Sequence, residues 1–304
     1  MAEPQTSITT ALATLQAVDP RLLERYGFRL EPSNFSTPLN KLQFLEDNQD
    51  LWAGPARPLD IDWRLDRQLE VAREVSRYVH ELADIPDRAG CGSEFYWQNN
   101  FWNNADALVQ YGLLRSRKPS ALIEVGCGFS SLLAARALGK NSEENPDQTA
   151  NVTLIEPNPL RELLDKLPRD WRLVESILQR CPLEWFERLG PGDVLFYDGS
   201  HCCHTASDVN WFFFQILPRL REGVLIHLHD IFFPFDYPRE WLFDRLQSWN
   251  EQFLLQAFLM NNSSYRVEIA NTFIAHERWA ELKALYGDIQ PFWGASFWMT
   301  KGAG

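Results

Sequence analysis

Two glycines and an acidic residue are spaced as the binding of a nucleoside would require. Gly126 and Gly128 end the apolar run of residues 121–125, and a helical pattern follows them. A strand, a Gly-x-Gly turn and a helix bring backbone N–H groups close to a ligand. Glu156 ends the next apolar run, about 30 residues later, where its carboxylate can accept hydrogen bonds from two ribose hydroxyls. These residues predict a nucleoside cofactor.

Glu124 distinguishes this loop from the fingerprint that binds dinucleotides. That fingerprint needs a third glycine at position 131, where the chain has Ser131. A carboxylate at position 124, inside the end of the strand, would repel a pyrophosphate but suits a cofactor that carries an ammonium and a sulfonium. A Gly-x-Gly pair alone is weak evidence, because a tight structural turn uses the same pattern. Together with Glu156 and the later strands, the loop favours the cofactor interpretation.

Two later strand ends carry the other residues that could do chemistry. One apolar run ends in Asp198 and is followed by His201, and the next run ends in His229 and Asp230. Ligands of doubly wound sheets lie beyond the carboxyl ends of the strands. We therefore expect Asp198, His229 and Asp230 to converge at that edge of the sheet.

Three interpretations of this cluster remain open. In the first, Asp198, His229 and Asp230 hold a divalent metal ion that binds the acceptor oxygen and lowers its pKa; an imidazole at position 229 would admit a transition metal as well as magnesium. In the second, no metal is needed and Asp198 orients a histidine as general base, with His201 the first choice and His229 the other. In the third, the aspartates cap the following elements and the histidines are structural. His227 lies deeper than His229 on the same side of its strand and is expected to be structural.

Two aromatic segments flank these residues. Residues 232–241 follow Asp230 directly and are rich in aromatic residues and proline. We expect them either to cover an apolar or ring-shaped acceptor or to dock against the N-terminal helices or a second subunit. Residues 95–106 place side-chain amides among aromatic residues, which fits contact with the cofactor or the acceptor, or a capped loop that leads into a helix over 105–115.

Composition narrows the classes of partner and the location. The 304 residues carry a net charge of −12, which argues against nucleic acid and against an anionic membrane surface, because both need a basic face. Five cysteines form no Cys-x-x-Cys pair and no zinc spacing, so a reducing cytoplasm is the expected location. The first residues lack the basic and apolar regions of a signal peptide, and no apolar run reaches the ~18 residues that span a bilayer.

The elements that position these residues follow from the apolar runs. From residue 119 onward, short apolar runs alternate with helical patterns, which is typical of a parallel sheet with crossover helices. The predicted strands are 121–125, 152–155, 171–174, 193–197, 224–229, 265–270 and 296–300. We expect an α/β fold over residues 96–304 with a doubly wound, mostly parallel seven-stranded sheet, closed by an antiparallel hairpin. Residues 1–95 are expected to form a helical extension packed on that domain.

Taken together, the motifs resemble the Methyltransferase 24 family of class I methyltransferases, which depend on S-adenosylmethionine (SAM). The matching segments are 118–119, 123–131, 155–157, 198–201, 207–210, 216–220 and 229–241. The resemblance implies a Rossmann-like core with Gly126 and Gly128 at SAM and Glu156 on its ribose. Distant relatives hold magnesium with acids after the fourth and fifth strands, which implies Asp198 and Asp230 in this chain. His229 departs from that pattern, because those relatives usually have a carboxylate there.

We therefore expect a SAM-dependent methyltransferase that acts on a hydroxyl of a small molecule, a sugar or another secondary metabolite, with or without a divalent metal. The cofactor site is expected to comprise Glu124, Gly126, Gly128, Ser130, Glu156 and Asp198. One alternative is an enzyme of the same fold that does not methylate, such as a hydroxylase, cyclase or lyase. The other is a non-catalytic SAM-binding partner subunit. The expected partner is a small-molecule acceptor, and a homo-oligomer is left open.

Overall fold

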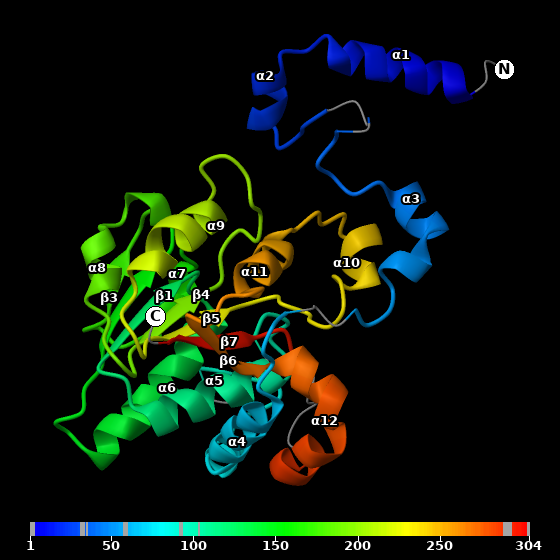
Figure 1. The fold of residues 1–304 in the computed structure, drawn as a ribbon. Coiled ribbons are helices and arrows are strands. Elements are labelled where there is room, and N and C mark those ends of the chain that lie inside the picture. Colours follow the sequence, from blue (N-terminus) through cyan, green and yellow to red (C-terminus); the bar gives the residue numbers. More distant parts are fainter. Residues whose placement is uncertain are drawn as a thin grey trace.

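The computed structural model describes residues 4–30, 34, 36–56, 60–90, 94–102, 104–287 and 294–302. Within them, helices cover both faces of a seven-stranded sheet (Figure 1). The strands are β1 (Ala121–Val125), β2 (Asn151–Ile155), β3 (Arg172–Val174), β4 (Val194–Tyr197), β5 (Leu225–Leu228), β6 (Tyr265–Ala270) and β7 (Phe297–Lys301).

The order of the strands confirms the predicted fold class. It is β3-β2-β1-β4-β5-β7-β6, with β1 to β5 parallel and β7 antiparallel to both β5 and β6. The chain changes direction across the sheet between β1 and β4. In open α/β sheets the crevice beyond the carboxyl ends of the strands at such a switch point is where ligands bind.

Two apolar layers hold the helices against the sheet. One layer contains residues of α4 (Leu65–Ser76), α5 (Asn104–Arg117), α6 (Phe129–Glu144) and α12 (Asn271–Tyr286). The other contains residues of α8 (Leu183–Glu187), α9 (Asp208–Trp211) and α11 (Glu251–Leu259). Val194 and Phe196 face the first layer, and Leu195 and Tyr197 face the second. A strand buried on both faces reads as an uninterrupted apolar run, as β4 does.

Shorter elements fill the connections. They are α1 (Pro4–Gln16), α2 (Pro20–Arg25), α3 (Leu42–Asp47), α7 (Arg161–Leu164), α10 (Arg239–Phe243), the 3₁₀ turns η1 (Gln49–Leu51), η2 (Val79–Leu82), η3 (Leu178–Arg180) and η5 (Leu217–Arg219), and the π-helical turn η4 (Phe212–Ile216). None of the described helices combines the length and the apolar character needed to cross a membrane.

Helix α4 covers the edge of the sheet at β6. The Gln68 side chain accepts a hydrogen bond from the Ala270 backbone N–H (3.0 Å). The guanidinium of Arg64, the residue before the helix, donates to the Val267 carbonyl (3.1 Å). These contacts occupy backbone groups that an edge strand otherwise leaves unpaired. This part of the N-terminal extension therefore packs on the sheet, as expected.

The first two helices differ from that expectation. Helices α1 and α2 stand away from the sheet (Figure 1). In α1, Ile8, Leu12 and Leu15 are 59, 45 and 41% exposed. Three large apolar side chains bury too little surface to offset the entropy of ordering this short helix against the domain.

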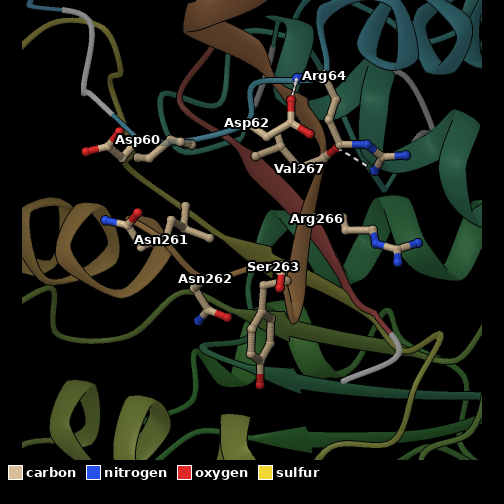
Figure 2. A pocket seen from close by; sticks show the side chains of 11 residues that line it. Asp60, Asp62, Arg64, Asn261, Asn262, Ser263, Arg266 and Val267 are labelled. Carbon is tan, nitrogen blue, oxygen red and sulfur yellow. Dashed lines mark hydrogen bonds between the residues drawn. The ribbon is translucent and has the colours of Figure 1, made fainter.

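A polar pocket of about 520 Å³ lies beside the first residues of β6 (Figure 2). Asp60, Asp62 and Asn261 line it, and Arg64 turns its guanidinium to Val267 there. Because β6 and β5 both run antiparallel to β7, the start of β6 lies at the amino ends of the parallel strands. The pocket is therefore at the opposite end of the sheet from the switch point.

Candidate functional site

The glycine loop lies against the end of β4. Gly126 has a φ of +83°, and its N–H donates to the carbonyl of Ile155 in β2 (3.0 Å). A Cβ at position 126 would lie 2.0 Å from the backbone oxygen of Asp198. Glycine alone fits both this backbone angle and this space. The loop thus brings together the ends of β1, β2 and β4.

Helix α6 begins directly after the loop. The Gly128 N–H donates to Ser131 Oγ (3.1 Å), so the residue that replaces the third glycine of the dinucleotide fingerprint caps this helix. A Cβ at position 128 would meet nothing within 4 Å. The space beside Gly128, at the amino end of α6, is therefore open, and the N–H groups of a first helical turn can bind an anionic group of a ligand there.

Glu124 is fully buried at the end of β1. Its Oε1 accepts a hydrogen bond from Ser130 Oγ (2.5 Å), and its Oε2 is buried without a hydrogen-bond partner among the described residues. Burial raises the pKa of Glu124 to about 7, although the hydrogen bond from Ser130 acts in the other direction. A ligand ammonium would give Oε2 a donor and would favour the ionised carboxylate.

Two adjoining pockets lie on either side of the loop. One has a volume of about 350 Å³ and extends toward η3; the other has about 280 Å³ and extends toward α7. Gly126, Glu156, Asp198 and Gly199 line both. Glu156 Oε1 accepts a hydrogen bond from the Asn158 N–H (2.8 Å), which fixes its carboxylate where the pockets meet. All the predicted cofactor residues except the buried Glu124 thus line these two pockets at the switch point.

The ends of β4 and β5 bring Asp198, His201 and Asp230 together. His201 Nε2 lies 3.2 Å from Asp198 Oδ1 and 3.6 Å from Asp230 Oδ2. One ligand atom from each residue lies within 4.8 Å of the other two, a spacing that could hold a metal ion. His201 and Asp230 both have a φ of +58°, so two left-handed turns direct these side chains toward each other.

His229 lies beside this cluster and is not part of it. Its Nε2 is 3.3 Å from Asp230 Oδ1, and Trp102 packs on its ring at 4.6 Å. Its Nδ1 is buried without a hydrogen-bond partner among the described residues. The observed cluster therefore differs from the predicted metal set, because it contains His201 in place of His229. The left-handed turn at His201 folds its ring back over the strand end, and the apolar pattern of the strands carries no sign of that turn.

The charge of His201 bears on its predicted role as base. Its Nδ1 donates to Glu251 Oε2 (2.9 Å). Burial lowers the pKa of His201, but the hydrogen bonds with Asp198 and Glu251 outweigh burial and raise the pKa well above its ordinary value. Without a metal ion these neighbours keep the imidazole charged, so it must lose a proton before Nε2 can act as a base or bind a metal. The base role stays a prediction, which the charges around His201 disfavour.

His227 is a core residue. It is fully buried, its Nε2 lies 3.0 Å from Ser296 Oγ, and its ring stacks on Phe196 at 3.9 Å. Burial holds the pKa of His227 well below its ordinary value, so the imidazole is neutral. Its position agrees with the structural role expected from its depth in the strand.

Residues 95–106 fit both interpretations of their sequence. The Asn99 side chain hydrogen bonds to the backbone of Tyr96, Phe101 and Trp102, which makes a capped loop ahead of α5. Phe101 and Trp102 also line the pocket beside the glycine loop. Asn103 lies outside the described residues.

Residues 232–241 pack against the N-terminal chain. The Ala56 N–H donates to the Pro234 carbonyl (2.7 Å), and Arg239 forms an ion pair with Glu46 (2.9 Å). A pocket of about 470 Å³ between the two segments is lined by aromatic side chains, Trp52 among them. One of the two expected roles, docking of the N-terminal region, is therefore seen, and the cover over an acceptor stays a prediction.

Two residues of the site have no motif that marks them. Glu251 begins α11, 50 residues beyond its partner His201. Trp249 lies over the His201 imidazole with ring centroids 4.1 Å apart. Only the fold reveals that this stretch returns to the ends of β4 and β5, whereas the aromatic and amide composition of residues 95–106 did signal Phe101 and Trp102.

The sheet order β3-β2-β1-β4-β5-β7-β6 with an antiparallel β7, a glycine loop at the switch point and an acid after β2 is the arrangement of the class I methyltransferase fold. Residues 123–231 match the family model described as a methyltransferase domain, Methyltransferase 24. This segment runs from β1 to the residue after Asp230. It contains the glycine loop and the cluster of Asp198, His201 and Asp230, the Asp–His–Asp cluster. The match confirms the resemblance carried by the motifs and supports a SAM-dependent class I methyltransferase domain in this segment.

Other similar proteins have low sequence identity to this chain. An uncharacterized protein of Archaeoglobus fulgidus is 29% identical over 135 residues, which are 43% of this chain and 59% of that protein. The chain thus spans less than two thirds of that relative. A structure of the plantazolicin methyltransferase BpumL with a pentazolic desmethyl analogue and SAH is 15% identical, with a TM-score of 0.37 over 80% of this chain and 100% of that chain. An O-methyltransferase of Bacillus cereus with SAH is 12% identical, with a TM-score of 0.38 over 86% and 96%.

Proposed function

We propose that this chain transfers the methyl group of SAM to a hydroxyl oxygen of a small molecule. The position of Asp198 carries the proposal. Asp198 lines both pockets beside the glycine loop, and it also belongs to the Asp–His–Asp cluster. A cofactor in the pockets and an acceptor at the cluster would therefore meet at this residue, and such placement supplies much of the rate of a direct transfer.

The charges in the two pockets support SAM as the ligand. No lysine or arginine is among the described residues that line them, whereas Glu156 and Asp198 line both. A cofactor with an ammonium and a sulfonium suits such a lining. We assign the ammonium to the side of Glu124, whose Oε2 lacks a donor, and the ribose hydroxyls to Glu156.

Asp198 is the residue best suited to orient the acceptor. Burial raises its pKa, but the charges of His229 and His201 outweigh burial, so the net pKa lies below the ordinary value. The carboxylate is therefore ionised at neutral pH and can accept a hydrogen bond from the acceptor hydroxyl. That hydrogen bond orients the oxygen of the hydroxyl toward the methyl group of SAM. The hydroxyl proton then points to Asp198, and a lone pair of the oxygen is free to attack.

The Asp–His–Asp cluster also fits a divalent metal ion. Two carboxylates and one imidazole are ligands that such ions accept, and their donor atoms are close enough to share one ion. When bound, the ion would hold the acceptor oxygen and lower its pKa. Asp198, His201 and Asp230 would be its protein ligands.

The described cysteines support a cytoplasmic location. Cys127, Cys181, Cys202 and Cys203 are free thiols. Cys91 lies outside the described residues. Thiols persist in reducing compartments, so we propose that the transfer takes place in the cytoplasm, on a small-molecule acceptor that is free in solution.

Two measurements test the proposed function. Calorimetric titration of SAH into the purified protein should show saturable binding that Glu156→Ala weakens strongly. Incubation with methyl-labelled SAM and either a simple catechol or a free monosaccharide should then give labelled product, which mass spectrometry would locate on oxygen. Absence of SAH binding would contradict the cofactor site. SAH binding with a product that gains no methyl group would favour the non-methylating alternative.

A further inference from the structure

Glu251 is a buried carboxylate that the proposed methyl transfer does not itself require. Its side chain is 1% exposed, and it is the first residue of α11. Its Oε1 has no hydrogen-bond partner among the described residues, and its Oε2 accepts the bond from His201 Nδ1 at 2.9 Å. Burial of a charged carboxylate costs free energy unless the group is paired, and the partner of Glu251 is His201.

The contact between His201 and the start of α11 is made by backbone as well as side chain. The His201 carbonyl accepts the N–H groups of Asn250 (3.1 Å) and Glu251 (3.3 Å). The Asn250 side chain in turn accepts the Cys203 N–H (2.6 Å). Residues 201–203 are therefore held against α11 at several points, and the Glu251 carboxylate stays at a constant distance from the imidazole.

These contacts between residues 201–203 and the start of α11 fix the orientation of the His201 imidazole. Because Nδ1 is bonded to Glu251, Nε2 points between Asp198 Oδ1 (3.2 Å) and Asp230 Oδ2 (3.6 Å). Trp249 covers one face of the ring at 4.1 Å, so rotation of the ring would break both the stacking and the hydrogen bond. Within the part of the chain that the structure describes, His229 has no such support, since its Nδ1 lacks a hydrogen-bond partner there.

We infer that Glu251 is a positioning residue that makes His201 Nε2 the nitrogen ligand of a mixed metal site completed by Asp198 and Asp230. Histidines that bind metals commonly donate their second ring N–H to a carboxylate, which fixes the tautomer and the ring orientation. The inference rests on the proposed function, because it concerns the same cluster. An imidazole with two carboxylates should favour Mn²⁺, Fe²⁺, Co²⁺ or Zn²⁺ over Mg²⁺, which prefers oxygen ligands alone.

The test uses the full chain, freed of metal with a chelator and titrated with CoCl₂ and, separately, MnCl₂ and MgCl₂. Visible absorption of bound Co²⁺ reports nitrogen coordination, and calorimetry gives each dissociation constant. We expect Glu251→Ala to weaken Co²⁺ and Mn²⁺ binding about 10- to 100-fold. Glu251→Gln should restore part of the affinity, because its amide oxygen still accepts from Nδ1. His201→Ala should abolish the nitrogen signature.

A matched control separates positioning from loss of stability. Glu268, on the edge strand β6, is also a buried carboxylate, but it forms an ion pair with Arg67 of α4 (2.9 Å). Glu268→Gln should leave all metal constants unchanged. If Glu251→Ala does not fold, histidine ¹⁵N spectra of the wild type and of Glu251→Gln decide the matter, since the inference requires Nδ1–H and a metal-sensitive Nε2 in His201.

The outcomes distinguish this inference from the proposed function. Equal Co²⁺ constants for the wild type and Glu251→Ala, or wild-type binding no tighter than that of Asp198→Ala, would overturn the inference. So would a wild type that prefers Mg²⁺. SAH binding by the wild type is measured separately and does not depend on these three results. Loss of SAH binding by the wild type would refute the proposed function instead.

Discussion

The hydroxyl of Ser130 donates a 2.5 Å hydrogen bond to Glu124 Oε1, while no described residue donates to the second oxygen of that buried carboxylate. At the end of β1, therefore, only one of the two carboxylate oxygens of a buried side chain has a hydrogen-bond donor among the described residues. Such a site is costly in the free protein and becomes favourable when a cation arrives. It therefore couples the stability of the free protein to pH.

The pH dependence follows from the pKa of Glu124, which burial raises from 4.5 to about 7. Between these values the folded protein keeps a proton that the unfolded chain has lost, so the free energy of unfolding falls as pH rises. The contribution of this group is about 3 kcal/mol. Glu124→Gln keeps an acceptor for Ser130 but cannot ionise. Urea unfolding at pH 5 and pH 8 should show a smaller decrease for the variant, and equal decreases in both proteins would contradict the assignment.

Gly126→Ala should destabilise the protein and abolish cofactor binding. Its φ of +83° alone would cost alanine about 1–3 kcal/mol, and its Cβ would collide with the Asp198 backbone oxygen at 2.0 Å. Thermal unfolding and SAH calorimetry measure the two effects. An unchanged melting temperature would show that the loop and β4 can separate freely.

Gly128→Ala is expected to behave differently. Its Cβ would meet no protein atom within 4 Å, and φ is −174°, which any residue adopts. Stability should therefore change by less than about 1 kcal/mol. SAH affinity should fall at least tenfold, because the added methyl group occupies the pocket beside the loop. Unchanged affinity would place the cofactor away from this face of the loop.

Gln68→Ala tests the contact between α4 and the edge strand. The fully buried side chain donates to the Trp63 carbonyl (2.5 Å) and accepts from the Ala270 N–H (3.0 Å). Removing it leaves two backbone groups without this partner, so the free energy of unfolding should fall by about 2–4 kcal/mol. Glu70→Ala, an exposed change on the same helix, should stay within about 1 kcal/mol of wild type. Similar values for both variants would refute the role of Gln68.

The centre of the sheet was predictable because β1, β4 and β5 are buried on both faces. Each of the seven strands begins and ends within one residue of its predicted position, since polar residues, glycine or proline border every apolar run. Gly126 and Glu156 came to the switch point for the same reason: residues at the ends of parallel strands share one edge.

The site was less predictable where geometry depends on turns and distant contacts. His201, and not His229, joins Asp198 and Asp230, because a left-handed turn reverses its direction. Glu251 reaches the cluster only through the return of α11 to the sheet. No local pattern encodes either event, so sequence spacing brought Asp198 and Asp230 together but did not indicate that His201 and Glu251 lie beside them.

Helix α4 has a consequence for how this protein behaves in a crowded solution. An uncovered edge strand is a template on which any extended peptide, including one from another copy, can add itself. Arg64 and Gln68 occupy backbone groups of β6 that would serve as that template. A domain trimmed to residues 96–304 would keep its glycine loop, but the edge strand β6 would be exposed to pairing with other chains. Helix α4 of the N-terminal extension thus protects the edge of the sheet against self-association, independently of any part that the extension has in catalysis.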